Sequence, residues 1–182
     1  MTIIAGFSSP PRLLPSEGTP SKKIKTPVDA AQHPQTIYGV TKVFGEQLGS
    51  YYSRKFGLDY RGLRYPAVIS SEKFDFSGSA CYSTEIFFEA LAKGEYKCWL
   101  SPKTTVPYLY IDDAVLSTLM LIKADKGRLS HTNYQVAGLS FPAEEWCKAV
   151  QKLIPGLKIT YEPDFRDAIA HSWTDSLDDS DL

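Results

Sequence analysis

The chain has few of the residues that build a disulfide scaffold or a metal centre. Its three cysteines, Cys81, Cys98 and Cys147, are an odd number and form no Cys-x-x-Cys motif. The three histidines are not spaced like metal ligands either. We therefore expect no bound metal, no disulfide framework and a reducing, intracellular setting.

A surplus of either charge and a long apolar run are also missing. Twenty basic and 21 acidic residues leave a formal charge of −1, so no basic field draws the chain to nucleic acid or anionic lipid. The richest apolar stretch, residues 115–122, is interrupted by Ser117 and Thr118 and is much shorter than the roughly 18 residues of a membrane span. Neither nucleic acid nor a membrane is an expected partner.

What is present is typical of one globular unit. The 182 residues are 43% hydrophobic and 23% charged, which is an ordinary composition for a single folded domain. Six of the twelve prolines lie within residues 1–34, where Phe7 is the one aromatic residue. We expect residues 1–35 to form a proline-rich N-terminal loop or tether, with a short strand at 2–5, and residues 36–182 to form a single incomplete α/β unit.

Helical and strand patterns alternate from residue 38 onward. An i, i+3, i+4 rhythm predicts one long helix over residues 38–56 that ends at Gly57, and an apolar run predicts strand over 58–65 and 67–69. The later patterns predict a helix at 85–93, a strand at 106–111, a helix at 114–123 capped by Asp112 and Asp113, a strand at 134–137, a helix at 142–154 and a strand at 158–161. This alternation favours a layered α/β fold with a largely parallel sheet.

Two residues of the long helix form a pair that can carry chemistry. Tyr38 and Lys42 are four residues apart, so a phenol and an ammonium share one helix face. A phenol has a pKa of about 10, and lowering it by three units takes about 4 kcal/mol, which an ammonium about 4 Å away supplies at an effective dielectric of about 20. The spacing alone is weak, because the composition predicts about one chance match, and Tyr51 with Lys55 is a second match.

Longer motifs favour the first pair. They are TIYGVTK at residues 36–42, LRYP at 63–66, YIDD at 110–113, YEPDFR at 161–166, and AIA, SW and SLDDS between 168 and 180. In this order they resemble the epimerase-like, extended short-chain family of L-threonine 3-dehydrogenases, from about Thr36 to the end of the chain. Sugar epimerases share the Tyr and Lys but not the pattern after residue 160.

The resemblance implies an incomplete Rossmann-type fold that oxidises the hydroxyl of L-threonine with NAD, giving 2-amino-3-oxobutanoate. Residues 36–71 and 106–140 would belong to the Rossmann part, and 72–105 and 141–182 to the substrate side. Tyr38 would remove the hydroxyl proton, Lys42 would favour the phenolate and hold the nicotinamide ribose, and the backbone at Val68 would meet the carboxamide. A mitochondrial or cytoplasmic location fits this family. Asp112 and Asp113 are better explained as helix-cap and first-turn charges than as catalytic groups.

Several family features are absent or changed. No two glycines stand two or three apart, so the turn that binds the pyrophosphate of a dinucleotide is missing, along with the family's N-terminal half. We therefore expect a truncated form with little activity alone. The hydroxyl residue upstream of Tyr38 stays open among Thr2, Ser8, Ser9 and Ser16. On the substrate side Ser79 keeps a family hydroxyl, but Cys81 replaces a carboxylate that would face the threonine ammonium, so threonine should bind weakly.

The same resemblance predicts a homodimer through the Tyr38 helix. Gly45 and Gly49 lie one turn apart inside it, and interior glycines are costly unless another element packs closely against them. A partner helix is one explanation, and the chain's own sheet is the other. Two rival functions also stay open: a non-catalytic interaction fragment, and a sugar-nucleotide epimerase or dehydratase relative.

Overall fold

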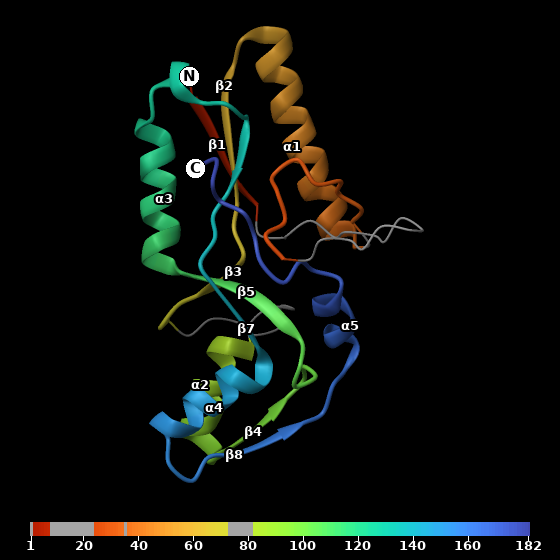
Figure 1. Ribbon diagram of the computed structural model, residues 1–182, viewed down its shortest axis with the longest axis vertical. Helices are drawn as coiled ribbons and strands as arrows, with labels where there is room; N and C mark the ends of the chain where they lie inside the picture. Colours follow the sequence, from red (N-terminus) through yellow and green to blue (C-terminus); the bar gives the residue numbers. More distant parts are fainter. Residues whose placement is uncertain (1, 8–23, 35, 73–81) are drawn as a thin grey trace.

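The structure is a computed structural model that describes residues 2–7, 24–34, 36–72 and 82–182. Figure 1 shows an upper unit, in which a sheet lies between two long helices, and a lower unit of shorter helices and strands. The chain passes between the two units several times, so each unit is assembled from segments that are distant in sequence.

Parallel pairing dominates the sheets. The strands are β1 (Thr2–Phe7), β2 (Asp59–Arg64), β3 (Ala67–Ile69), β4 (Glu95–Cys98), β5 (Thr105–Tyr110), β6 (Asn133–Gln135), β7 (Leu139–Pro142) and β8 (Lys158–Tyr161). They form one sheet in the order β1-β2-β6, a second in the order β3-β5-β7 and a β4-β8 pair. Among the strands of the described residues, only β5 and β7 pair antiparallel. The largely parallel α/β fold predicted from the sequence is confirmed.

Helices cover the faces of these sheets. They are α1 (Ile37–Phe56), α2 (Tyr82–Lys93), α3 (Ile111–Lys123), the short 3₁₀ helix η1 (Lys126–Arg128), α4 (Ala143–Leu153) and α5 (Phe165–His171). In the upper unit α1 and α3 flank the β1-β2-β6 sheet on opposite sides, and in the lower unit α2 and α4 pack together (Figure 1). No helix in the described part of the chain is long and apolar enough to cross a membrane.

Aromatic rings build the core of the lower unit. Tyr108, Phe141 and Trp146 stack with ring centroids 4.8 and 5.1 Å apart, and their planes differ by 18° and 8°. Leu100, Ile86 and their neighbours complete this core, while a smaller cluster around Leu63 and Leu121 lies under α3 in the upper unit.

The long helix α1 follows the sequence prediction closely. Thr36 caps it by accepting a hydrogen bond from the backbone N–H of Gly39 at 3.1 Å. Gly57 ends it with a φ of +68°, a left-handed conformation that favours glycine. Both ends were predictable because capping depends on neighbours in sequence.

Three expectations for other elements were wrong or incomplete. Helix α3 begins at Ile111, and its N-cap is Tyr110, with no side-chain cap bond, because β5 runs directly into the helix. Asp112 and Asp113 therefore lie in the first turn and do not cap it. The sequence patterns also missed β4, β7 and α5, which are too short for a periodic signal.

The N-terminal segment is more integrated than a tether. Strand β1 pairs with β2 along its whole length, from Thr2 opposite Asp59 to Phe7 opposite Arg64. Thr26 and Val28 are buried although Pro27 lies between them. Proline prevents helix but permits an extended segment that is held by hydrogen bonds to other parts of the chain.

Gly49 is accounted for by the chain's own sheet. A Cβ at this position would lie 2.2 Å from the Tyr60 ring, so glycine is needed for α1 to approach β2. For Gly49 the structure therefore supports the packing alternative and not helix pairing.

Candidate active site

The direction of α1 against the sheet decides where its side chains lie. Gly49 packs on Tyr60, near the start of β2, whereas Glu46 forms an ion pair with Arg64 at the end of β2, so helix and strand are antiparallel. Figure 1 shows the N-terminal end of α1 pointing toward the lower unit. Tyr38 is eight residues before Glu46, which places it about 12 Å farther along the helix axis, beyond the carboxyl end of β2.

This is the edge at which α/β folds with parallel sheets bind ligands. Tyr38 and Lys42 lie there together, with the Lys42 Nζ 5.1 Å from the centroid of the Tyr38 ring. Tyr38 is 46% exposed, so a substrate can reach its phenol. The pair can therefore act as a proton acceptor supported by a fixed positive charge.

The second Tyr-x-x-x-Lys match lies at the other end of the helix. Tyr51 and Lys55 follow Gly49 toward the amino end of β2, away from the ligand-binding edge. Tyr51 packs edge-on against Tyr52 and Phe56, with ring centroids 5.9 and 6.2 Å apart. The structure thus distinguishes two pairs that their spacing does not.

A buried ion pair holds the helix in this position. Glu46 accepts hydrogen bonds from the Arg64 guanidinium at 2.9 and 2.7 Å, and the two side chains are 3% and 7% exposed. Arg64 also donates to the Val28 carbonyl at 2.6 Å, and Gln32 donates to Glu46 at 3.3 Å. Sequence reasoning missed this pair, although an arginine in a strand expected to be covered on both faces requires a buried partner.

The other predicted site residues are less fully placed. Val68 lies half-buried in β3, opposite Leu109, just after β2 has ended. Ser79 and Cys81 lie outside the described residues, as do three of the four upstream candidates, Ser8, Ser9 and Ser16. Thr2, the remaining upstream candidate, pairs with Asp59 at the amino end of β2, whereas Tyr38 lies beyond the carboxyl end of that strand.

Residues 174–179, which include most of the SLDDS motif, bind residues 24–28 at the carboxyl edge of the sheet, and we call this contact the C-terminal clasp. The backbone of Thr26 exchanges hydrogen bonds with Ser176 and Asp178, both 3.0 Å long. Gln135, at the end of β6, donates to the carbonyls of Thr26 and Asp178 at 2.8 and 3.1 Å. Residues 24–28 and 174–179 are thereby fixed beside the ends of β2 and β6, which gives this part of the motif a structural role.

Asp167, in α5, joins the C-terminal stretch to residues 101–104. Its carboxylate accepts hydrogen bonds from the Ser101 N–H and Oγ at 2.9 and 2.5 Å and from Thr104 Oγ1 at 2.7 Å. Burial raises the pKa of Asp167, but the hydrogen bonds from Ser101 and Thr104 outweigh it, so the pKa lies below its ordinary value. This aspartate anchors α5.

No group of three metal-binding side chains occurs among residues 2–7, 24–34, 36–72 and 82–182.

Comparison of the amino-acid sequence with known proteins identifies related sequences. L-threonine 3-dehydrogenase, mitochondrial, of Bos taurus is 41% identical over 171 residues, covering 93% of this chain and 46% of the relative. A Staphylococcus haemolyticus protein described as an uncharacterized epimerase/dehydratase is 41% identical over 166 residues, covering 90% of this chain and 52% of the relative. The chain thus spans about half the length of these relatives.

Solved structures agree. L-threonine dehydrogenase from Phytophthora infestans superposes with a TM-score of 0.89 at 39% identity, covering 100% of this chain and 57% of that one. A nucleoside-diphosphate-sugar epimerase from Agrobacterium tumefaciens, at 20% identity and a TM-score of 0.76, shares the fold. The family model described as "NAD dependent epimerase/dehydratase family" matches residues 14–137, and this chain belongs to that family.

Proposed function

We propose that this chain is the catalytic and substrate-side part of an NAD-dependent L-threonine 3-dehydrogenase. The observation that carries the proposal is the Tyr38–Lys42 pair at the carboxyl edge of the parallel sheet, with the ammonium 5.1 Å from the ring centroid. The 41% identity to the bovine enzyme of that name supports the choice of substrate. A mitochondrial or cytoplasmic location is proposed with it.

In this proposal Tyr38 accepts the proton of the threonine hydroxyl as the carbonyl forms. The positive charge of Lys42 favours the phenolate, and its ammonium group can donate a hydrogen bond to a ribose hydroxyl. The backbone at Val68 would meet the nicotinamide carboxamide. NAD, when bound, supplies the acceptor for the hydride that leaves the threonine carbon.

The residues present suit only the nicotinamide end of that cofactor. A dinucleotide pyrophosphate needs closely spaced glycines at a helix N-terminus, and no two glycines of the chain are two or three apart. We propose that a separate or additional polypeptide supplies this turn, and that the 182 residues alone neither bind NAD nor turn over. Calorimetry that detects a micromolar NAD site in the isolated chain would contradict this.

Activity is tested on the chain combined with a polypeptide that carries the glycine-rich half of a homologous dehydrogenase. NAD reduction with L-threonine is followed by absorbance. Tyr38→Phe should lower the rate by about 10²- to 10⁴-fold, the usual contribution of a general base. Tyr51→Phe is the matched control, because Tyr51 is on the same helix and is also 46% exposed. Equal losses in the two variants would refute the assignment of Tyr38.

A sugar-nucleotide epimerase or dehydratase is the second candidate, since the Staphylococcus haemolyticus relative is named an uncharacterized epimerase/dehydratase. A turnover screen of L-threonine against nucleotide sugars separates the two.

We further propose that Ser79 and Cys81 face the substrate, so that Cys81→Asp should tighten threonine binding. The gain expected from one charged hydrogen bond, about 1.5–3 kcal/mol, corresponds to about 10- to 150-fold. An unchanged KM would remove Cys81 from the site.

We also propose that two copies pair through α1. Phe44, Leu48 and Tyr51 are exposed apolar side chains along this helix. Sedimentation of Phe44→Glu should show weaker self-association than the parent, with Phe165→Glu on α5 as the exposed aromatic control.

A non-catalytic interaction fragment, the remaining alternative, is favoured if the chain binds a full-length homologue but the combined halves stay inactive.

A further inference from the structure

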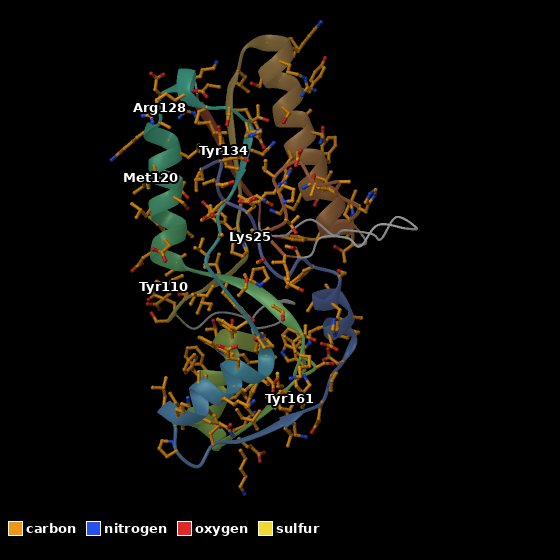
Figure 2. The ribbon with its side chains drawn as sticks, in the orientation of Figure 1. Lys25, Tyr110, Met120, Arg128, Tyr134 and Tyr161 are labelled. Atoms are coloured by element: carbon orange, nitrogen blue, oxygen red, sulfur yellow. The ribbon has the colours of Figure 1, made fainter. Side chains whose placement is uncertain are left out.

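A cavity of about 610 Å³ lies in the lower unit, between α2, α4 and the ends of β3 and β5. Its lining includes Tyr110, which Figure 2 labels, and Asp113, so the cavity reaches the start of α3. Its volume falls within the range of about 300–1,000 Å³ that is usual for small-molecule pockets. None of the described lining residues belongs to α1, so the cavity is separate from the Tyr38–Lys42 pair.

Rigid aromatic side chains form much of its wall. The Phe87 ring meets Trp146 edge-on at 5.9 Å between centroids, and the Tyr108 ring stacks with Trp146 at 6.3 Å. The Trp146 indole N–H donates to the Ser83 carbonyl at 3.1 Å, which fixes the orientation of the ring. Such a wall favours a ligand with a flat apolar body, because no side chain has to be ordered on binding.

Two of the lining residues, Thr84 and Tyr108, carry a hydroxyl that lacks a hydrogen-bond partner among the described residues. Thr84, on α2, lines the cavity and is 2% exposed, and its hydroxyl has no hydrogen-bond partner in the part of the chain that the structure describes. An unpaired buried hydroxyl is unfavourable unless a ligand or water satisfies it. The Thr84 hydroxyl oxygen is itself buried, so a polar group of a ligand can bond to it when the side chain turns toward the cavity.

Charge narrows the ligand class. Asp113, in the first turn of α3, is the one charged residue among the described lining, and no lysine, arginine or histidine is among them. A carboxylate or phosphate would meet a like charge there with no cation to offset it. Neutral and positively charged ligands are thus preferred over anions.

We propose that this cavity is a binding site for a flat apolar molecule that carries an amine or hydroxyl group, with Thr84 as its hydrogen-bond partner. The cavity includes neither Tyr38 nor Lys42, and the proposal does not depend on the role of that pair. Its ligand inserts the apolar body against Phe87 and Trp146 and directs the polar group to the Thr84 hydroxyl.

The test uses the 182-residue chain and 1-aminoanthracene, a flat aromatic amine whose fluorescence rises in apolar surroundings. We expect saturable one-site binding. Thr84→Val, which keeps the side-chain shape, should weaken binding about five-fold, as the loss of one neutral hydrogen bond implies. Anthracene-1-carboxylate should compete at least about ten-fold less well than the amine, and Asp113→Asn should narrow that difference.

A matched pair of exposed leucines keeps the test independent of folding defects. Leu91 on α2 lines the cavity and is 76% exposed, whereas Leu153 on α4 does not line it and is 74% exposed. Leu91→Ala should weaken binding of the probe, and Leu153→Ala should not. Equal effects of the two, absence of saturable binding, or equal competition by the carboxylate would each overturn the proposal.

Discussion

Removing the charge of Glu46 tests the reasoning that places Tyr38 at the carboxyl edge of the sheet. Glu46 neutralises the Arg64 guanidinium through two hydrogen bonds in a site where both side chains are almost fully buried. Glu46→Gln leaves Arg64 as a buried charge without its counter-ion, which typically costs about 3–5 kcal/mol. Because the amide can still accept one hydrogen bond, we expect the lower end, about 3 kcal/mol, or about a 150-fold fall in the folding equilibrium constant.

Urea unfolding followed by circular dichroism measures this loss. With a denaturant slope of about 2 kcal/mol per molar, the midpoint should fall by about 1.5 M. The control is Glu89→Gln, which removes an exposed i, i+4 ion pair with Lys93 and should cost at most about 0.5 kcal/mol. Replacing both partners, Glu46→Leu with Arg64→Met, should cost less than Glu46→Gln alone. If Glu46→Gln were no more destabilising than Glu89→Gln, the ion pair would not be what fixes α1 on β2.

Three further substitutions test local packing and charge. Gly49→Ala should destabilise the chain by about 1–3 kcal/mol in urea unfolding, because the new methyl group meets the Tyr60 ring; a stabilised variant would show that α1 has room to move. Asp167→Asn should cost about 2 kcal/mol at pH 7. Since the folded-state pKa of Asp167 lies below its ordinary value, the parent loses this advantage as the pH falls below about 4, so the two proteins should converge in acid; a pH-independent difference would refute the charge argument. Arg166→Lys should reduce the free energy of unfolding by about 0.5–1 kcal/mol and so lower the thermal midpoint. The reason is that the guanidinium lies 4.1 Å from the Trp99 ring centroid and a lysine cannot stack there; an unchanged midpoint would contradict this.

Sequence reasoning succeeded where the determining interactions are local. The apolar rhythm and Gly57 predicted α1 and its end, and the Thr36 cap, which the structure adds, also acts within a few residues. The alternation of helix and strand likewise predicted a layered, largely parallel fold, and the longer motifs indicated the family.

Other features depend on contacts between distant parts of the chain. Tyr38 with Lys42 and Tyr51 with Lys55 have the same spacing, and only the antiparallel packing of α1 on β2 places the first pair at the ligand-binding edge. The burial of Thr26 depends on the C-terminal clasp some 150 residues later, at Ser176.

The apolar cavity was equally invisible in the sequence, because Phe87, Tyr108 and Trp146 come from three elements that carry no shared motif. Spacing along a helix determines which side chains share a face. Which sheet edge, cavity or partner that face meets is decided only when the chain folds, since burial and ion pairing join residues without regard to their distance in sequence.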